Sequence, residues 1–137
     1  MITDIDALVR ACVLRLPTVV AVAGTRIYVA TDLPPGYDPN AVPARPTTTG
    51  PAVFFTGRGG RPSVTSVLSD PTYLARCYAA NEVAARDLDA RLLVALHDRS
   101  FGRIRSVRCT VTGQHTQDSA TGWHFFLSTW QLIVVIA

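Results

Sequence analysis

The sequence contains no lysine, so all thirteen of its basic residues are arginine. A purely electrostatic role would accept lysine as well, and the absence therefore points to the coding bias of a GC-rich genome rather than to nucleic-acid binding. The excess of basic over acidic residues is also small, because ten acidic residues reduce the net charge to +3. Each arginine is nevertheless a planar cation that can bind a carboxylate or a phosphate through two hydrogen bonds.

Cysteine is scarce, and long apolar runs are missing. The three cysteines, Cys12, Cys77 and Cys109, are widely spaced and odd in number, which excludes a disulfide framework and a CxxC metal half-site. We expect them to be small core residues.

The longest apolar run, residues 132–137, is too short to span a membrane. The first six residues carry two acids and no base, which argues against a secretory signal. We therefore expect folding in a reducing cytoplasm and no membrane partner.

Motifs that carry chemistry are also missing. The three histidines, His97, His115 and His124, lie at no metal-ligand spacing from one another or from a cysteine. No GxSxG elbow occurs that would present a nucleophilic serine. Asp87 and Asp89 fall among arginines on what we predict to be a solvated helix face. The sequence therefore predicts no catalytic residue, no cofactor and no bound metal.

A glycine-rich segment at residues 57–62 needs separate consideration, because glycine and arginine together can cradle a phosphate. The segment lacks the Lys-Ser/Thr ending of a P-loop and leads into a predicted strand rather than a helix. We interpret it as a flexible hairpin tip. Its two arginines, Arg58 and Arg61, are candidates for docking on an acidic patch of a partner.

Apolar residues at three-and-four spacing predict two amphipathic helices, at residues 3–16 and 82–97. Pro17 ends the first helix, and Asn81 caps the second. Strands are predicted at residues 26–29, 52–56, 63–68, 73–79, 104–112 and 123–136, with a polar turn at 113–122 between the last two. This order of elements predicts an α+β fold, a mostly antiparallel sheet with two helices packed on one face. We expect a single domain that spans residues 1–137.

Residues 32–51 contain six of the nine prolines, and they also contain a Thr-Thr-Thr-Gly run. Such a segment cannot form a helix or a central strand. Long irregular loops in compact domains are uncommon and usually have a binding role. We therefore predict a partner-contacting loop at about 32–51, with Tyr37 and Arg45 as candidate contact residues.

The last predicted strand is apolar on both of its faces, which is typical of a strand that is covered on both sides. One face is expected to meet the helices and the other a neighbouring chain, with Trp130 as a candidate interface residue. A basic cluster surrounds the start of the preceding strand and consists of Arg99, Arg103, Arg105 and Arg108. Strict alternation would place Arg103 and Arg105 on one face of that strand and Arg108 on the other. We interpret the cluster as a modest partner-facing patch.

Four segments together carry a resemblance to a known family: "GTRIYVATDLPPG", the strand "PAVFFTGRGG", the strand and helix "YLARCYAANEVAARDLDARLLVALHD", and the closing hairpin "IRSVRCTVTGQ…TGWHFFLSTWQLIVV". In order and spacing, the chain resembles the tail-terminator (tail-completion) proteins of siphoviruses and related prophages over nearly its whole length. It departs from the family in a longer Pro/Thr loop and in the GRGGR segment.

The resemblance implies a structural protein of the virion with no enzymatic activity. Such a protein forms a ring, usually a hexamer, at the head-proximal end of the tail tube. The ring ends polymerisation of the tube protein and binds a head-side connector or stopper protein, and DNA passes through it only as cargo. Two alternatives remain open. The first is a nucleic-acid binding module that uses its arginine clusters, and the second is another neck protein such as a head-tail stopper.

Overall fold

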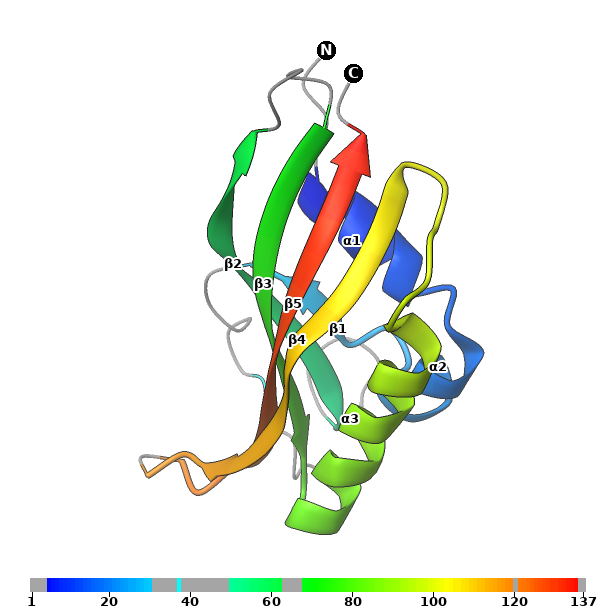
Figure 1. The fold of residues 1–137 in the computed structure, drawn as a ribbon. Coiled ribbons are helices and arrows are strands. Elements are labelled where there is room, and N and C mark those ends of the chain that lie inside the picture. Colours follow the sequence, from blue (N-terminus) through cyan, green and yellow to red (C-terminus); the bar gives the residue numbers. More distant parts are fainter. Residues whose placement is uncertain (1–4, 31–36, 38–49, 63–67, 120, 136–137) are drawn as a thin grey trace.

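The computed structural model describes residues 5–30, 37, 50–62, 68–119 and 121–135, and of residues 58–62, 68 and 69 it describes the backbone alone. Three helices and five strands occur in the described part of the chain. In chain order they are α1 (Ile5–Val13), α2 (Pro17–Ala23), β1 (Ile27–Val29), β2 (Ala52–Pro62), β3 (Leu68–Ala79), α3 (Glu82–Leu96), β4 (Ile104–Gln117) and β5 (His124–Val135) (Figure 1).

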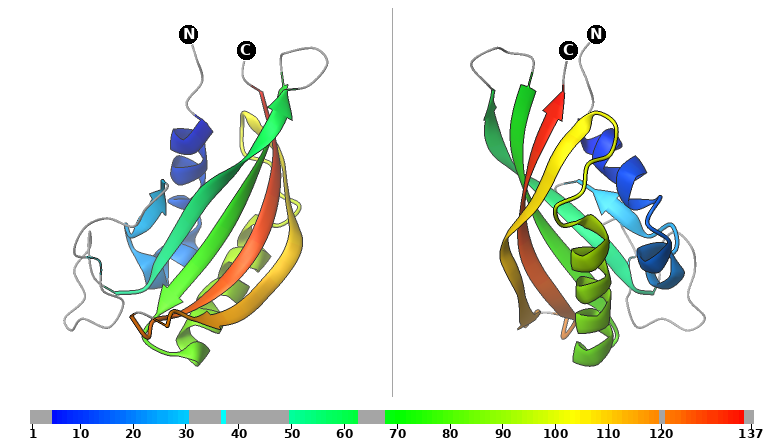
Figure 2. Two further views of the ribbon diagram at one scale, coloured as in Figure 1. Left: turned by 90° about the vertical axis from the view of Figure 1, so that its left-hand side faces the viewer. Right: turned by 45° about the vertical axis from the view of Figure 1, so that its right-hand side comes forward.

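The strands form one twisted sheet in the order β1-β2-β3-β5-β4, in which only the β1–β2 pair is parallel. Side chains of all three helices share a single hydrophobic core with the sheet, so the helices cover one face of it. None of the three described helices lies on the other face, as the two views in Figure 2 show. The predicted α+β class, with a mostly antiparallel sheet and helices on one face, is confirmed.

One helix was not predicted. The apolar segment after Pro17 forms α2 rather than an irregular lead into the first strand. The prediction that Pro17 ends the first helix is wrong, because α1 already ends at Val13. Pro17 instead occupies the first turn of α2, where its fixed φ suits a helix and its missing N–H costs no hydrogen bond. Val19 and Ala23, four residues apart, bury the inner side of this helix. The sheet is therefore covered by three helices instead of two.

The second predicted helix is confirmed as α3, together with its cap. The Asn81 side chain accepts a hydrogen bond from the backbone N–H of Ala84 at 2.8 Å. Glu82–Arg86 and Asp87–Arg91 form the predicted ion pairs between residues four apart. The buried stripe of α3 consists of Ala85, Leu88, Leu92 and Leu96. Complete burial of a leucine contributes about 2 kcal/mol from the hydrophobic effect, so this stripe determines which side of α3 faces the sheet.

Three strands are longer than predicted. β3 begins at Leu68 rather than at Tyr73, and the rest of the separate strand predicted at 63–68 lies outside the described residues. The glycine-rich segment 57–62 is not a hairpin tip but the second half of β2, paired with β3 through Gly57–Tyr73, Gly60–Pro71 and Arg61–Asp70. A β-bulge between Gly57 and Gly60 accommodates the extra residues, and glycine tolerates such a bulge. Likewise, β4 continues through the first half of the predicted polar turn to Gln117, because its polar side chains lie on a solvated edge strand.

The aspartate at position 89 does not lie on a solvated face, contrary to the sequence-based interpretation. Its carboxylate packs against Gly113 of β4, and a Cβ atom at position 113 would overlap it. Burial raises the pKa of Asp89. It also lies close enough to raise the pKa values of Cys77 and Cys109 further. A glycine in β4 therefore makes room for a partly desolvated carboxylate on α3.

We expect Asp89→Asn to stabilise the protein at neutral pH. Because the pKa is raised in the folded state, the ionised carboxylate opposes folding above that pKa, and this cost disappears as the pH falls through it. Solvent screens the exposed side of the carboxylate, so the gain should be about 1 kcal/mol or less. Urea unfolding at pH 7 and at pH 4 measures it, and the advantage of the variant should shrink at the lower pH. Asp87→Asn is the matched control, because Asp87 is exposed and paired with Arg91. A gain by the control, or none by Asp89→Asn, would contradict this account.

Candidate partner-binding surface

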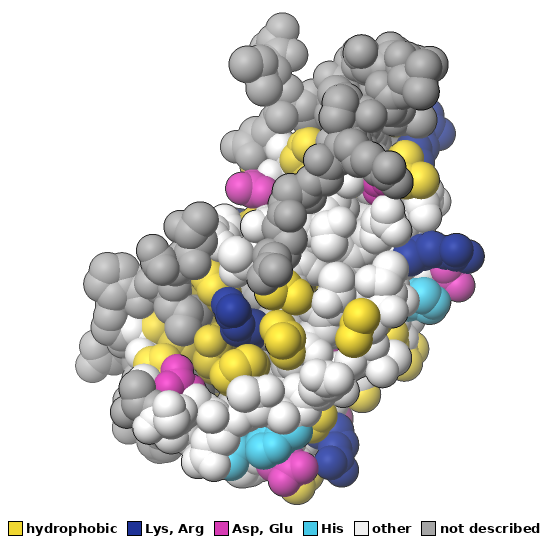
Figure 3. Space-filling model, turned by 60° about the vertical axis from the view of Figure 1, so that its left-hand side comes forward, with side chains coloured by type: hydrophobic (Ala, Val, Ile, Leu, Met, Phe, Trp, Pro, Cys, Tyr) yellow, Lys and Arg dark blue, Asp and Glu magenta, His cyan; other side chains and the backbone are white. Residues whose placement is uncertain are grey.

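The face of the sheet that points away from the helices carries an apolar patch. The register between β2, β3 and β5 places its side chains in neighbouring rows: Phe54 lies opposite Arg76, Arg76 opposite Leu127, and Tyr78 opposite Phe125. Figure 3 shows hydrophobic side chains gathered around a basic side chain on this side of the molecule. We call this surface the open-face patch; it consists of Phe54, Leu74, Arg76, Tyr78, Phe125 and Leu127. Leu74, Arg76, Phe125 and Leu127 are partly exposed, whereas Phe54 and Tyr78 are buried and form the base of the patch.

Arg76 lies at the centre of the open-face patch. Its guanidinium carbon is 5.9 Å from the ring centroid of Phe54 and 5.9 Å from that of Phe125. This distance is within the range of cation–π attraction, which favours a guanidinium over the face of a ring. Within the described part of the chain, no carboxylate forms an ion pair with it. An arginine held among aromatic side chains is the type of residue that contributes strongly at protein interfaces.

Tyr37 lies beside this patch and is buried within its own chain. Its ring packs edge-on against Tyr28, Tyr78 and Trp123, at centroid distances of 6.0, 5.8 and 5.6 Å. Its hydroxyl donates a hydrogen bond to the carbonyl of Gly50 at 2.8 Å. Only 5% of Tyr37 is exposed. The predicted contact residue is therefore an intramolecular anchor on the sheet, and the surface that it offers to a partner is small.

Trp130, the other aromatic candidate, points to the opposite face of β5. It is 1% exposed and belongs to the core shared with the helices. The expectation that β5 is apolar on both faces is confirmed, since Phe125 and Leu127 occupy the open face. The structure therefore places Trp130 in the core rather than on an accessible surface.

The basic cluster lies at the outer edge of the sheet, where β4 begins. Arg99 and Arg105 are exposed. The Arg103 Nε donates a hydrogen bond to the carbonyl of Val135 at 3.1 Å, and Arg108 lies 3.5 Å from a carboxylate oxygen of Asp98. The predicted strict alternation is wrong, because a β-bulge between Ile104 and Ser106 interrupts it and places Arg108 opposite Gln131 on the open face. Arg99, Arg103 and Arg105 all lie on the solvent side of this edge.

Three further predicted contact residues lie where the structure describes no side chain. Arg45 falls outside the described residues, as does most of the predicted loop at 32–51. The side chains of Arg58 and Arg61 are likewise outside the description, although their backbone belongs to β2. Their roles stay predictions.

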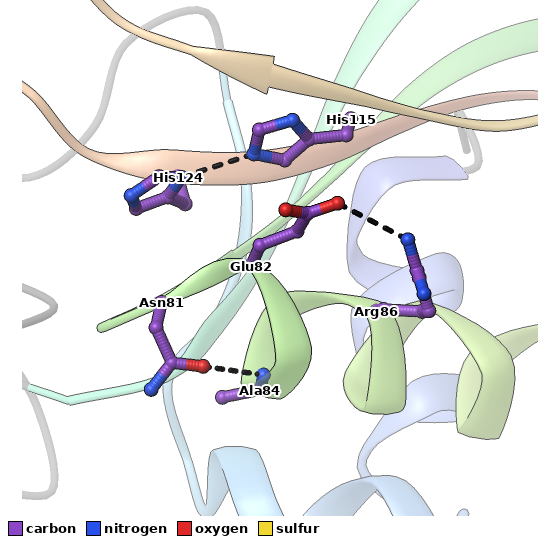
Figure 4. A network of polar contacts seen from close by, with 6 residues as sticks. All are labelled: Asn81, Glu82, Ala84, Arg86, His115 and His124. Carbon is purple, nitrogen blue, oxygen red and sulfur yellow. Dashed lines mark hydrogen bonds and ion pairs between the residues drawn. The ribbon is translucent and has the colours of Figure 1, made fainter.

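Two histidines on different strands come together at the end of the β4–β5 hairpin that is near its turn. His115 Nε2 and His124 Nδ1 are 3.0 Å apart, and the rings stack at 21°. Figure 4 shows the pair beside the first turn of α3, where Glu82 binds Arg86. The spacing of nine residues gave no signal, because strand pairing creates the contact. In the described part of the chain, no group of three or more potential metal ligands is found.

Two of the three cysteines, Cys12 and Cys77, are free and buried, and Cys109 is partly buried. Burial raises the pKa of Cys12 to about 11 and raises that of Cys77 well above its ordinary value. A thiol must lose its proton to act as a nucleophile or a metal ligand. Both residues are therefore core residues, as the sequence predicted.

No family model matches the sequence, and no curated protein matches it. A search of solved structures finds a similar fold in a chain of the virion of a native gene transfer agent particle. The two chains superpose with a TM-score of 0.62 at 14% sequence identity, over 95% of this chain and 93% of the other. At this identity the likeness shows a shared fold over almost the full length of both chains. Among the described helices, none is both long and apolar enough to cross a membrane.

Proposed function

We propose that this chain is a structural protein of a phage-like virion, and that it acts as a tail terminator. In this proposal, copies of the chain form a ring, most simply a hexamer, on the last ring of the tail tube. The ring stops the addition of further tube protein and presents a surface to the head-side connector or stopper. The function is association through packed surfaces, and it requires no catalytic residue.

The single observation that carries the proposal is the full-length fold similarity to a gene transfer agent virion chain. The open-face patch adds physical support, because it combines three partly exposed apolar side chains, Leu74, Phe125 and Leu127, with a central arginine. Interfaces of this composition are usually buried against another protein. A head-to-tail interface closes into a ring when the rotation between neighbours is a simple fraction of a turn.

We assign contacts with the tube and connector to the parts of the chain that lie outside this patch. The loop at 32–51, with Arg45, and the pair Arg58 and Arg61 are proposed to bind acidic surfaces of these partners. The exposed cluster of Arg99, Arg103 and Arg105 is proposed to do the same. Arginine suits this task because its guanidinium can bind a carboxylate through two hydrogen bonds.

Assembly of the cognate tube protein in the presence of the purified chain tests the proposal. Negative-stain images are expected to show rings at one end of the tubes, and the tubes should stop growing at that end. Tubes of an unrelated phage serve as the control and should stay uncapped. Rings that bind the head connector but not the tube would instead indicate a head-tail stopper. If the tubes keep their length and appearance, and the purified chain binds DNA with an affinity that falls steeply with salt, the result would favour the nucleic-acid binding module.

A further inference from the structure

The outer side of α3 carries a second apolar stripe. Val83 and Val94 are 76% and 75% exposed, the largest exposure among the large hydrophobic residues described. Together with Asp87 and Ala90, they are spaced four, three and four residues apart, so all four lie along one line of the helix. This line is on the side opposite the buried stripe of Ala85, Leu88, Leu92 and Leu96. We call the four residues the α3 outer stripe.

Exposed valines at two positions of one helix line are not explained by the fold of the chain itself. Valine has a lower helix propensity than alanine or the long polar residues, so it does not stabilise an exposed helix position. The outer stripe also borders a shallow groove of about 330 Å³ between α2 and α3, lined by Thr18, Asp87, Ala90, Arg91 and Val94. An apolar line beside a groove can pack against another surface.

The α3 outer stripe and the open-face patch point in opposite directions. α3 packs its buried stripe on one face of the sheet, and the open-face patch lies on the other face (Figure 2). The two surfaces therefore cannot meet within one chain. In a head-to-tail arrangement of copies, however, the outer stripe of one copy can meet the patch of the next, and such copies form a ring when each is rotated relative to its neighbour by a fixed fraction of a turn.

The two surfaces also match in size and charge. The stripe from Val83 to Val94 is roughly 16 Å long at the rise of an α-helix. The patch from Leu74 to Tyr78 extends along β3 for roughly 13 Å at the rise of a strand. The patch has a cation at its centre, Arg76, with no carboxylate partner in the described residues. The stripe has an anion between its valines, Asp87, whose side chain is 54% exposed.

We propose that the open-face patch binds α3 of a second copy of this chain, with Asp87 of one copy against Arg76 of the next. The inference rests on the proposed ring and specifies the surfaces that join its subunits. Packing of a helix on the open face gives each sheet a helix layer on both sides, which is the arrangement in which a sheet with two apolar faces is stable. Arg91, which pairs with Asp87 at 2.8 Å in the separate chain, stays available to share the carboxylate.

A charge exchange tests the inference. Arg76→Glu and Asp87→Arg each place like charges opposite one another, so each is expected to lower the fraction of protein in rings about tenfold or more. The double variant restores opposite charges and should recover the ring fraction to within about twofold of the natural protein. Native mass spectrometry and size-exclusion chromatography with light scattering measure this fraction. Arg15→Glu is the matched control: it changes the net charge as Arg76→Glu does, at an exposed position outside both surfaces, and should leave the rings intact.

A second variant tests the apolar part of the contact. Val94→Ser removes an exposed side chain, so it should leave thermal unfolding of the separate chain almost unchanged while it weakens ring formation. Circular dichroism of the dilute protein verifies that each variant is folded. Rings of natural abundance in Arg76→Glu, Asp87→Arg and Val94→Ser would overturn the inference. A failure of the double variant to recover would also overturn it, because the two charges would then not face each other.

The outcomes separate this inference from the proposed function. Rings that respond to the charge exchange but never bind tail tubes support the inference and refute the tail-terminator role. Rings that bind tubes and are insensitive to all three single variants refute the inference alone. Loss of tube binding in Arg76→Glu with intact rings would show that the tube protein occupies the open face, which also refutes it. A natural protein that stays monomeric both in solution and on tubes refutes both.

Discussion

Replacing Trp130 by alanine is expected to lower the free energy of unfolding by about 3–5 kcal/mol. Trp130 is 1% exposed, and its ring packs against that of His97 at a centroid distance of 6.4 Å. Its indole N–H donates a hydrogen bond to the Ser128 hydroxyl at 2.8 Å. The substitution therefore leaves a cavity between α3 and the sheet and removes a buried hydrogen bond. Urea unfolding followed by circular dichroism measures the loss.

The control for this prediction is on the same strand. Ile133→Ala changes a residue that is 40% exposed on the open side of β5, so its effect should be about 1 kcal/mol or less. The result also decides between two roles for Trp130. A Trp130→Ala protein with natural stability but impaired assembly would show that the indole acts at an interface, as the sequence suggested, and that its placement in the core is wrong.

Arg26→Ala is the second substitution with a large expected effect, a loss of about 2–4 kcal/mol in the free energy of unfolding. Arg26 is 7% exposed although it is charged. Its Nε donates to the carbonyl of Pro51 at 2.7 Å, and its Nη2 donates to the carbonyl of Val22 at 3.2 Å. One side chain thereby connects the last turn of α2 to the start of β2. Its positive charge also stabilises the negative end of α2.

Without the guanidinium, the carbonyls of Val22 and Pro51 lose a donor in a site that water reaches poorly, and the parallel pairing of β1 with β2 loses its support. Amide exchange of Ile27–Val29 should therefore accelerate more than that of β3. Arg26→Lys keeps the charge but not the planar set of donors, so it should recover only part of the stability. Arg15→Ala, at an exposed position, is the control and should have little effect. A natural unfolding midpoint in Arg26→Ala would contradict this role.

The parts of the fold that local interactions determine were predictable from sequence. The spacing of apolar residues located α1 and α3, and Asn81 identified the start of α3 to the residue. Alternation and β-branched residues located β1, β3 and β5. In each of these cases the signal lies within a few residues of the element that it predicts, so no knowledge of distant segments is needed.

The misplaced elements are those that depend on distant pairing. Residues 57–62 resemble a turn in their composition, yet β3 supplies a partner along their whole length and a bulge absorbs the extra residues. The polar residues after position 112 suggested a turn for the same reason, and β5 pairs with them as far as Gln117. The helix α2 was missed because Pro17 suggested the end of a helix, whereas it lies in the first turn of α2 and α1 ends earlier, at Val13.

The candidate surface was predictable only in part. The composition of β5 indicated a strand with apolar side chains on both faces, and Phe125 and Leu127 do lie on the open side. Sequence could not show which aromatic residue faces the core, so Trp130 was placed on the wrong side of the strand. Nor did it distinguish Arg76 from the other arginines, because the contacts of Arg76 with Phe54 and Phe125 join three strands.

By itself, the sequence determined the α+β class and the Asn81 cap of α3. It also determined that β5 has apolar side chains on both of its faces, as a strand that is covered on both sides does. These features follow from hydrophobic periodicity and backbone propensity, which act between near neighbours in the chain. Only the tertiary structure decided that β2 extends through the glycine-rich segment 57–62, and that Arg76 lies between the rings of Phe54 and Phe125 on the open face. It also decided that Val83 and Val94 point outward. These features depend on strand order and register, which bring together residues tens of positions apart and cannot be derived from local preferences.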